Sequence, residues 1–232
     1  METTPEWDRR LWLGPVTCAW FFAWTAGLDA LRPEYDFAHK AVSELGALGA
    51  PYMASMNLFG FLGTGALLAG FAAGYRATFG AAAVGVRALY STALLFAATA
   101  IPMGLGADGD PDYTSAWTRA HLVPVLLAPL PWLAAVWGVA RQWRGGSLRS
   151  LGWISGLALV LFVAHGAATI SGVGAAVPGA MQRVGFAVFL GWYAAFGVAA
   201  MTLAARTSSG THTSSDPRPV QGKAPRPERP GG

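Results

Sequence analysis

Three histidines and an aspartate in this chain have side chains that could hold a metal ion. His39 and Asp110 lie in connections between long apolar runs. His121 opens the fourth of these runs, and His165 lies inside the fifth. Neutral imidazoles and a carboxylate are typical zinc ligands, and a zinc-bound water becomes a nucleophile near neutral pH. Because no HExxH or tight HxxxH spacing is present, a zinc cofactor requires the fold to bring these four residues together.

A second set of polar residues could bind a ligand without a metal. It combines an acid at the end of the first apolar run, three residues of the next connection and a basic residue at the start of the last run: Asp29, His39, Ser43, Glu44 and Arg183. An ionisable side chain near membrane depth indicates a functional site by default. The alternative is structural, with such groups bonded to neighbouring helices. We expect a polar pocket for a lipid or small ligand.

Six apolar runs must position these residues, and only 12% of the 232 residues are charged. The runs lie near residues 11–31, 53–75, 85–106, 120–140, 151–174 and 184–204. About 20 apolar residues cross a bilayer as a helix, and backbone groups cannot stay unpaired in lipid. The sequence therefore predicts an all-α integral membrane protein with six transmembrane helices in a bundle. Pro124, Pro129 and Pro131 predict a kink in the fourth helix.

Basic residues are sorted onto alternate connections between the runs. With the N-terminus in the cytoplasm, the outer segments hold only Arg32, Lys40, Arg119 and Arg183, and the other twelve basic residues fall inside. The positive-inside rule then places both termini in the cytoplasm. We expect the protein in the cell (inner) membrane. We expect a cytoplasmic N-terminus over 1–10 and a transmembrane domain over 11–204. The candidate residues would lie at or near the outer side.

Two segments outside the spans also have an expected structure. Asp36 suits a helix N-cap and Gly46 a helix end, so a short interfacial helix is predicted over residues 37–45. On such a helix His39 and Ser43 would share a face, because they are four residues apart. A plain cap on the bundle is the alternative for this segment. Residues 205–232 are rich in Ser, Thr, Pro and Gly, which predicts a disordered cytoplasmic tail.

The net charge of +4 does not indicate nucleic-acid binding. Its basic residues flank the apolar runs, so membrane topology explains them, and no basic–aromatic nucleic-acid motif is present. We expect membrane lipids as partners and no nucleic acid. The single cysteine, Cys18, cannot form an internal disulfide.

Three stretches of the chain carry a resemblance to a known family. They are YDFAHKAVSELGALGAPYMASMNLFGF at 35–61, the Asp-Gly-Asp-Pro segment followed by His121, and GAMQRVGFAVFLGWYAA at 179–195. On these stretches the chain resembles the bacterial membrane family called domain of unknown function 998, over roughly residues 11–205. The resemblance implies a six-helix membrane protein and no established activity. By residue type alone, the Ser, Asp and His residues are also similar to those of the zinc-binding alkaline ceramidase and adiponectin-receptor superfamily.

Four functions fit this topology. The leading hypothesis is a non-catalytic membrane protein whose outward-facing polar pocket binds a lipid or small ligand. The alternative is a membrane-embedded metal-dependent hydrolase acting on a lipid amide or ester, which metal content would distinguish. A transporter would need a polar pathway through the bundle. A membrane terpene cyclase would use acids near Asp29 and Glu44, with aromatic faces to stabilise a carbocation.

Overall fold

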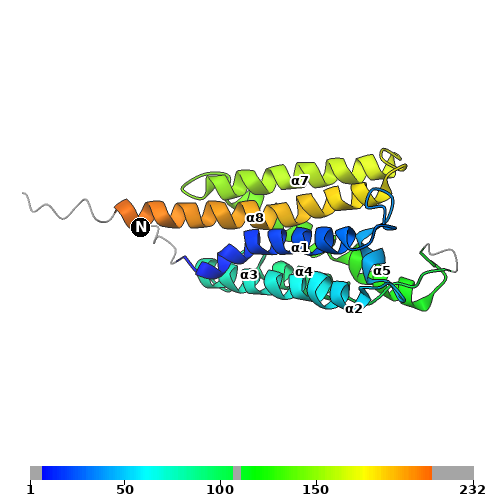
Figure 1. Ribbon diagram of the computed structural model, residues 1–232. Coiled ribbons are helices and arrows are strands. Elements are labelled where there is room, and N and C mark those ends of the chain that lie inside the picture. Colours follow the sequence, from blue (N-terminus) through cyan, green and yellow to red (C-terminus); the bar gives the residue numbers. More distant parts are fainter. Residues whose placement is uncertain (1–6, 107–110, 211–232) are drawn as a thin grey trace, which may run out of the picture.

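The computed structural model describes residues 7–106 and 111–210, and in these ranges long helices run side by side as a bundle (Figure 1). The first half of the chain contains η1 (Arg9–Trp12), α1 (Leu13–Ala30), η2 (Val42–Gly46), α2 (Met53–Ser55), the π-helix η3 (Met56–Leu62), α3 (Gly63–Phe79) and α4 (Val86–Ala98). The second half contains α5 (Ala116–Leu127), α6 (Pro129–Gln142), α7 (Arg149–Ile170) and α8 (Pro178–Gly210). The predicted all-α class is confirmed.

Five helical segments of the described chain are long and apolar enough to cross a membrane. They are Arg9–Ala30, Met53–Phe79, Ala116–Gln142, Arg149–Ile170 and Pro178–Arg206. Large apolar side chains remain exposed on their outer faces; Trp153 is 75% exposed and Val160 65%. An apolar surface of this kind indicates contact with lipid rather than water. The protein is therefore a multi-pass membrane protein.

The third predicted span forms a shorter helix than expected. We expected residues 85–106, but α4 ends at Ala98 and is 13 residues long. At 1.5 Å per residue this helix covers only about 20 Å. Pro102 explains the early end, because the ring of a proline disfavours helical backbone at the residue before it. The Thr99 hydroxyl donates to the carbonyl of Phe96 at 2.6 Å and closes the last turn.

The fourth span is interrupted, as the prolines predict. Its helical hydrogen bonds break at Ala128, between α5 and α6, although Ala128 keeps helical backbone angles. Pro129 and Pro131 have no N–H to donate, so two helical bonds of this turn cannot form. The span is therefore two helices joined end to end rather than one regular helix.

The two ends of the bundle differ in their connections and in charge. The terminal end holds the start of η1, the end of α8 and the connections 80–85 and 143–148 (Figure 1). The loop end holds the connection 31–52, the described parts 99–106 and 111–115 of the next connection, and the connection 171–177. Described basic residues at or near the terminal end are Arg9, Arg10, Arg76, Arg87, Arg141, Arg144, Arg149 and Arg206. The loop end has Arg32, Lys40, Arg119 and Arg183.

The terminal half of the bundle is filled by aromatic side chains. The ring centroids of Phe79 and Trp143 lie 4.7 Å apart, and those of Trp192 and Phe196 lie 5.3 Å apart. The buried indole N–H of Trp192 donates to the Ser155 hydroxyl at 2.9 Å. Such rings bury much apolar area and pack at these separations in protein cores. This half belongs to a packed core that continues to the loop end and holds the helices in place.

Two sequence predictions need correction at the ends of elements. The helix expected over 37–45 is absent as such; residues 37–40 form turns, and only Val42–Gly46 is helical, as the 3-10 helix η2. The last helix does not end near residue 204, because α8 continues to Gly210. Residues 211–232 of the predicted tail lie outside the described residues.

Candidate functional site

Arg183 forms the centre of an ion-paired cluster at the loop end. Its Nη2 atom lies 3.1 Å from Asp29 Oδ2 and 3.3 Å from the Tyr35 hydroxyl. Its Nη1 atom donates to the carbonyls of Phe37, Lys40 and Gly179 at 2.8–3.1 Å. We call Asp29, Tyr35 and Arg183 the Arg183 cluster. The cluster joins the end of α1, the connection after it and the start of α8.

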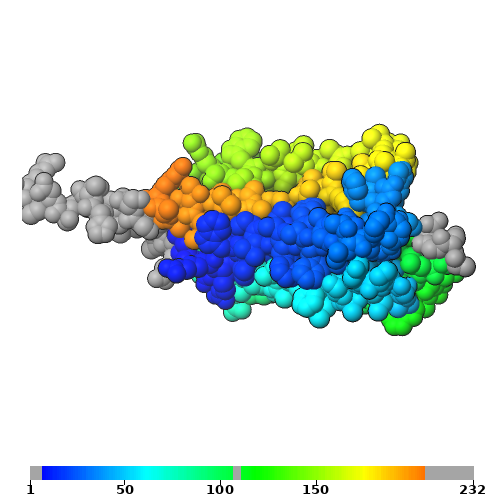
Figure 2. Space-filling view, viewed as in Figure 1, coloured from blue at the N-terminus to red at the C-terminus, as the bar shows by residue number. Residues whose placement is uncertain are grey.

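The connection after α1 lies directly against α8. Figure 2 shows the light-blue connection beside the yellow start of α8, and the Ala180 N–H donates to the Ala38 carbonyl at 3.0 Å. Gly179 is needed here, because a Cβ at this position would overlap the backbone of Lys40. Burial raises the pKa of Tyr35 to about 12, so its hydroxyl stays protonated and donates to the carbonyls of Lys40 and Ala41.

Two amide side chains hold the short helix η2, which follows this connection. Gln182 Oε1 accepts the N–H of Val42 at 2.7 Å. Asn57 Nδ2 donates to the carbonyl of Gly46 at 2.9 Å. These bonds fix the two ends of η2 to α8 and to η3. Ser43 is therefore held in one place although it lies in a connection rather than in a long helix.

Ser43 and His121 form a buried hydrogen-bonded pair. Ser43 Oγ lies 2.9 Å from His121 Nε2, and His121 Nδ1 lies 2.7 Å from the Ile101 carbonyl oxygen. A carbonyl can only accept, so Nδ1 carries the proton and Nε2 accepts the Ser43 hydroxyl proton. The edge of Phe61 packs against the imidazole. The pair is thus a hydroxyl donating to an imidazole whose tautomer is set by a backbone carbonyl.

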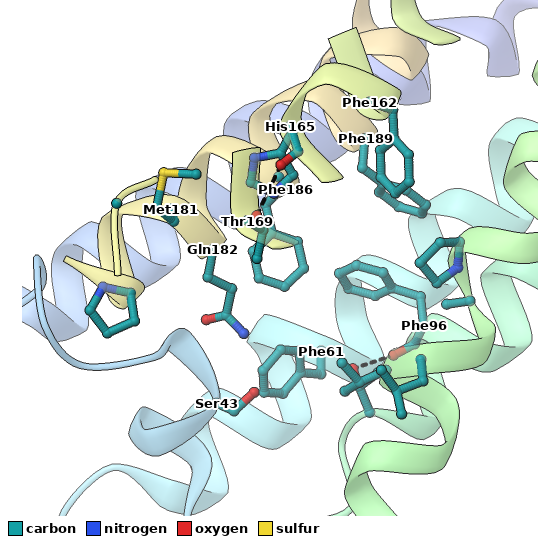
Figure 3. Close-up of a pocket in the computed structure, with 18 of the residues that line it drawn as sticks. Ser43, Phe61, Phe96, Phe162, His165, Thr169, Met181, Gln182, Phe186 and Phe189 are labelled. Carbon is teal, nitrogen blue, oxygen red and sulfur yellow. Dashed lines mark hydrogen bonds between the residues drawn. The ribbon is translucent and has the colours of Figure 1, made fainter. Parts of the chain in front are cut away.

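A cavity of about 480 Å³ opens beside Ser43 (Figure 3). Its apolar wall includes the phenylalanines Phe61, Phe96, Phe162, Phe186 and Phe189. Its polar groups come from Ser43, Thr99, His165, Thr169 and Gln182. Ligand pockets commonly have this size and this combination of many apolar side chains with a few polar groups.

Two polar groups of the cavity wall have no hydrogen-bond partner among the described residues. Gln182 gives its oxygen to Val42, which leaves its NH₂ group unbonded, and Figure 3 shows this nitrogen turned toward Phe61. His165 Nδ1 is buried and also unpartnered. A Cβ at Gly185 would lie 2.7 Å from His165 Nε2, so this glycine makes room for the ring. We call Ser43, His121, His165 and Gln182 the cavity cluster.

The structure separates the residues of the predicted zinc site. His39 is on the surface, where its Nδ1 lies 2.7 Å from Asp36 Oδ2, and His121 uses both ring nitrogens as described above. Within the described residues, no three His, Cys, Asp or Glu side chains could hold a metal ion. His39, His121 and His165 therefore do not form the expected ligand set. Asp110, the fourth member, lies outside the described residues.

The predicted ligand-binding residues fall into different environments. Asp29 and Arg183 bind each other, and Glu44 accepts the Ala41 N–H at 2.7 Å and lies 3.3 Å from Lys40 Nζ. Only Ser43 of the five lines the cavity. His39 and Ser43 do not share a helix face, because no helix joins them.

The sequence of this chain matches one family profile, described as "Protein of unknown function (DUF998)", over residues 15–199. The chain belongs to this family. The match to DUF998 runs from α1 into α8 and contains both the Arg183 cluster and the cavity cluster. No curated protein and no solved structure matches the chain. A DUF998 protein has no assigned activity to transfer, so function must be argued from the site.

Some residues that build the site were missed from sequence. Tyr35 and Asn57 were not predicted to have a role, yet each positions the connection that carries Ser43. For Asn57 a signal was available, because it is the only amide in the apolar run 53–79. For Tyr35 and the cavity phenylalanines no signal existed, since aromatic residues are common throughout this chain.

Proposed function

We propose that this DUF998 protein binds a lipid or small apolar molecule with one polar group, inside the cavity at its loop end. The observation that supports the proposal is the cavity of about 480 Å³ with an aromatic wall and unpaired polar groups. An apolar chain would lie against the phenylalanines. A carbonyl or similar acceptor would accept from the N–H groups of Gln182, which have no partner among the described residues.

The position of the cavity favours a ligand that arrives from the membrane. Leu126 and Val173 line it and are 69% and 61% exposed on the outer surface of the bundle. In the described chain α7 packs on α6 and α8 rather than on α5. We therefore place the opening between α5 and the end of α7, where these exposed apolar side chains would meet lipid. A membrane lipid could enter there without crossing water.

We further propose that the loop end faces outward from the cell (inner) membrane and that both termini are cytoplasmic. The support is the larger number of basic residues at the terminal end, which the positive-inside rule places in the cytoplasm. Asp29 and Glu44, the acids considered for a terpene cyclase, are bonded to Arg183 and to Lys40 and the backbone. This bonding favours ligand binding over cyclase chemistry.

A cavity-filling variant tests the binding function. Thr169 lines the cavity and its hydroxyl is already bonded to the His165 carbonyl, so Thr169→Trp should fill space without breaking an essential bond. Thr202→Trp is the matched control, because Thr202 makes the same kind of bond to Val198 in α8 but does not line the cavity. Native mass spectrometry of the purified proteins should show a bound lipid-sized mass in the wild type and in Thr202→Trp, and a loss of at least tenfold in Thr169→Trp. Equal occupancy in all three would contradict the proposal.

A further inference from the structure

We propose that Ser43 and His121 form a metal-free acyl-transfer site, with Ser43 as nucleophile and His121 as general base, acting on the ester group of a lipid in the cavity. This inference rests on the proposed binding function and adds an activity to it. It differs from the zinc hydrolase considered from the sequence, because the described residues offer a serine–histidine pair and no metal-binding group.

The hydrogen bonding of Ser43 differs from that of many helical hydroxyls in the described bundle. Several of them donate to the carbonyl four residues earlier in their own helix, as in Thr17, Thr25, Thr92, Ser155 and Thr169. Such a bond satisfies a buried hydroxyl locally and is the ordinary structural arrangement. Ser43 instead donates to an imidazole 78 positions away in sequence. A nucleophile and its base require this donor–acceptor order.

The tautomer of His121 is the one that general-base catalysis requires. Nδ1–H is directed to the Ile101 carbonyl, so the lone pair of Nε2 faces the Ser43 proton. The carbonyl would also stabilise the imidazolium that forms when Nε2 takes that proton. His121 is only 2% exposed and Ser43 only 7%, so bulk water does not compete for this bond.

Gln182 supplies a donor for the oxygen of a bound ester. Its Oε1 is fixed by Val42, which is the residue before Ser43, so the amide is anchored next to the nucleophile. Its NH₂ group has no partner in the described chain and faces the cavity (Figure 3). A preorganised N–H directed at a developing oxyanion is commonly worth a factor of about 10²–10³ in rate. Gln182 is therefore the residue that would stabilise the tetrahedral intermediate.

The reaction proceeds in two balanced steps. In the first, Ser43 Oγ forms a bond to the ester carbonyl carbon and its proton passes to His121 Nε2. The tetrahedral intermediate collapses, the carbon–oxygen bond to the alcohol breaks, and the alcohol leaves with the proton from His121. In the second, a water attacks the acyl-Ser43 carbonyl and gives a proton to His121. The carboxylic acid is released, and the proton on His121 returns to Ser43 Oγ.

The test uses a fluorophosphonate probe with an alkyl chain on the full-length protein in lipid nanodiscs. A reactive Ser43 forms an oxygen–phosphorus bond, fluoride leaves and His121 takes the proton. Peptide mass spectrometry should place the adduct on Ser43 of the wild type. Ser43→Ala should carry no adduct, and His121→Gln should react at least 100-fold more slowly. Ser155→Ala is the control, because Ser155 is a buried hydroxyl with a structural bond, and it should react like the wild type.

Hydrolysis of p-nitrophenyl octanoate by the same samples supplies a second readout, with loss expected in Ser43→Ala. Mapping the adduct in the wild type keeps the test valid even if a variant does not fold. A wild type that gives no Ser43 adduct, or one that reacts equally at other serines, would overturn the acyl-transfer proposal. Lipid occupancy measured on the same wild-type sample separates the two proposals: lipid without an adduct leaves the binding function standing, whereas neither lipid nor adduct removes both.

Discussion

The Arg183 cluster and the cavity cluster both lie at the loop end, but their hydrogen bonding differs. In the Arg183 cluster, one guanidinium satisfies three carbonyls, a carboxylate and a phenol. In the cavity cluster, the NH₂ of Gln182 and Nδ1 of His165 remain unpaired. The bonds of Arg183 are thus made to groups of the protein itself, whereas the cavity cluster keeps unpaired polar groups beside a cavity, where a ligand could bind them.

Gln182 and Arg183 belong to different clusters although they are adjacent in sequence. Neighbouring residues of a helix point in different directions, about 100° apart at 3.6 residues per turn. Arg183 is directed to Asp29 and the first connection, and Gln182 to Val42 and the cavity. One turn of α8 therefore supplies structural support through Arg183 and a cavity contact through Gln182. The charge of the two side chains does not by itself assign these roles.

The largest effect should follow the loss of the Arg183 side chain. Arg183→Ala leaves Asp29 without its partner and removes one donor from each of three carbonyls, so we expect a loss of about 3 kcal/mol in unfolding free energy. Thermal unfolding in detergent measures it. Arg183→Lys, which keeps the charge but not the planar fork, should lose less. A variant that melts like the wild type but has lost its lipid would reverse the roles given to the two clusters.

The second effect concerns the space that Gly185 provides for His165. In Gly185→Ala the new Cβ meets the His165 ring, which must move within the cavity wall. We expect lipid occupancy to fall about tenfold and stability to fall by about 1–3 kcal/mol. Gly191→Ala in the same helix is the control, because a Cβ there meets nothing within 4 Å. Similar behaviour of the two variants would show that His165 has no fixed role in the cavity.

The third effect should appear at alkaline pH. The pKa of Tyr35 is raised to about 12 from its usual value of 10, mainly by burial. The folded protein therefore favours the protonated phenol, and this contribution to stability is complete below pH 10 and lost as the pH rises toward 12. Tyr35→Phe cannot ionise at this position, so its melting temperature should fall less steeply than that of the wild type between pH 10 and 12. Parallel curves would argue against burial of this phenol in the Arg183 cluster.

The smallest effect is expected for His39. Its ring is exposed and contacts Asp36 at the surface, outside both clusters. His39→Ala should change unfolding free energy by less than about 0.5 kcal/mol and leave lipid occupancy unchanged. Urea or thermal unfolding together with native mass spectrometry would measure both. A clear loss of bound lipid would show that His39 belongs to the ligand-binding site, as the sequence predicted.

Membrane class, helix positions and the loop end were predictable because they depend on local hydropathy and charge. The interruption of the fourth span before Pro129 was also predictable, since proline lacks an N–H. Which polar residues meet was not, because that depends on how the connection after α1 folds. The predicted helix over 37–45 was wrong. The Asp36 carboxylate instead accepts the Ala38 N–H and contacts His39 Nδ1 within a turn.

The pairing of Ser43 with His121 could not be predicted from the sequence, for a related reason. The two residues lie 78 positions apart, and no spacing pattern links them. Their contact requires η2 to be fixed by Gln182 and Asn57, two neutral residues whose partners are backbone groups. Sequence patterns indicate side-chain chemistry, but they do not show which backbone group a side-chain amide will hydrogen-bond.

The most direct test of the comparison is a paired measurement on neighbouring residues of α8. Lipid occupancy by native mass spectrometry and melting temperature should be measured together for Gln182→Met and Arg183→Lys. Gln182→Met should lose at least tenfold in occupancy with a stability cost of about 1 kcal/mol for the lost Val42 bond. Arg183→Lys should lose more stability and keep its lipid. Equal losses of lipid in both variants, or a loss only in Arg183→Lys, would contradict the assignment of ligand binding to the cavity cluster.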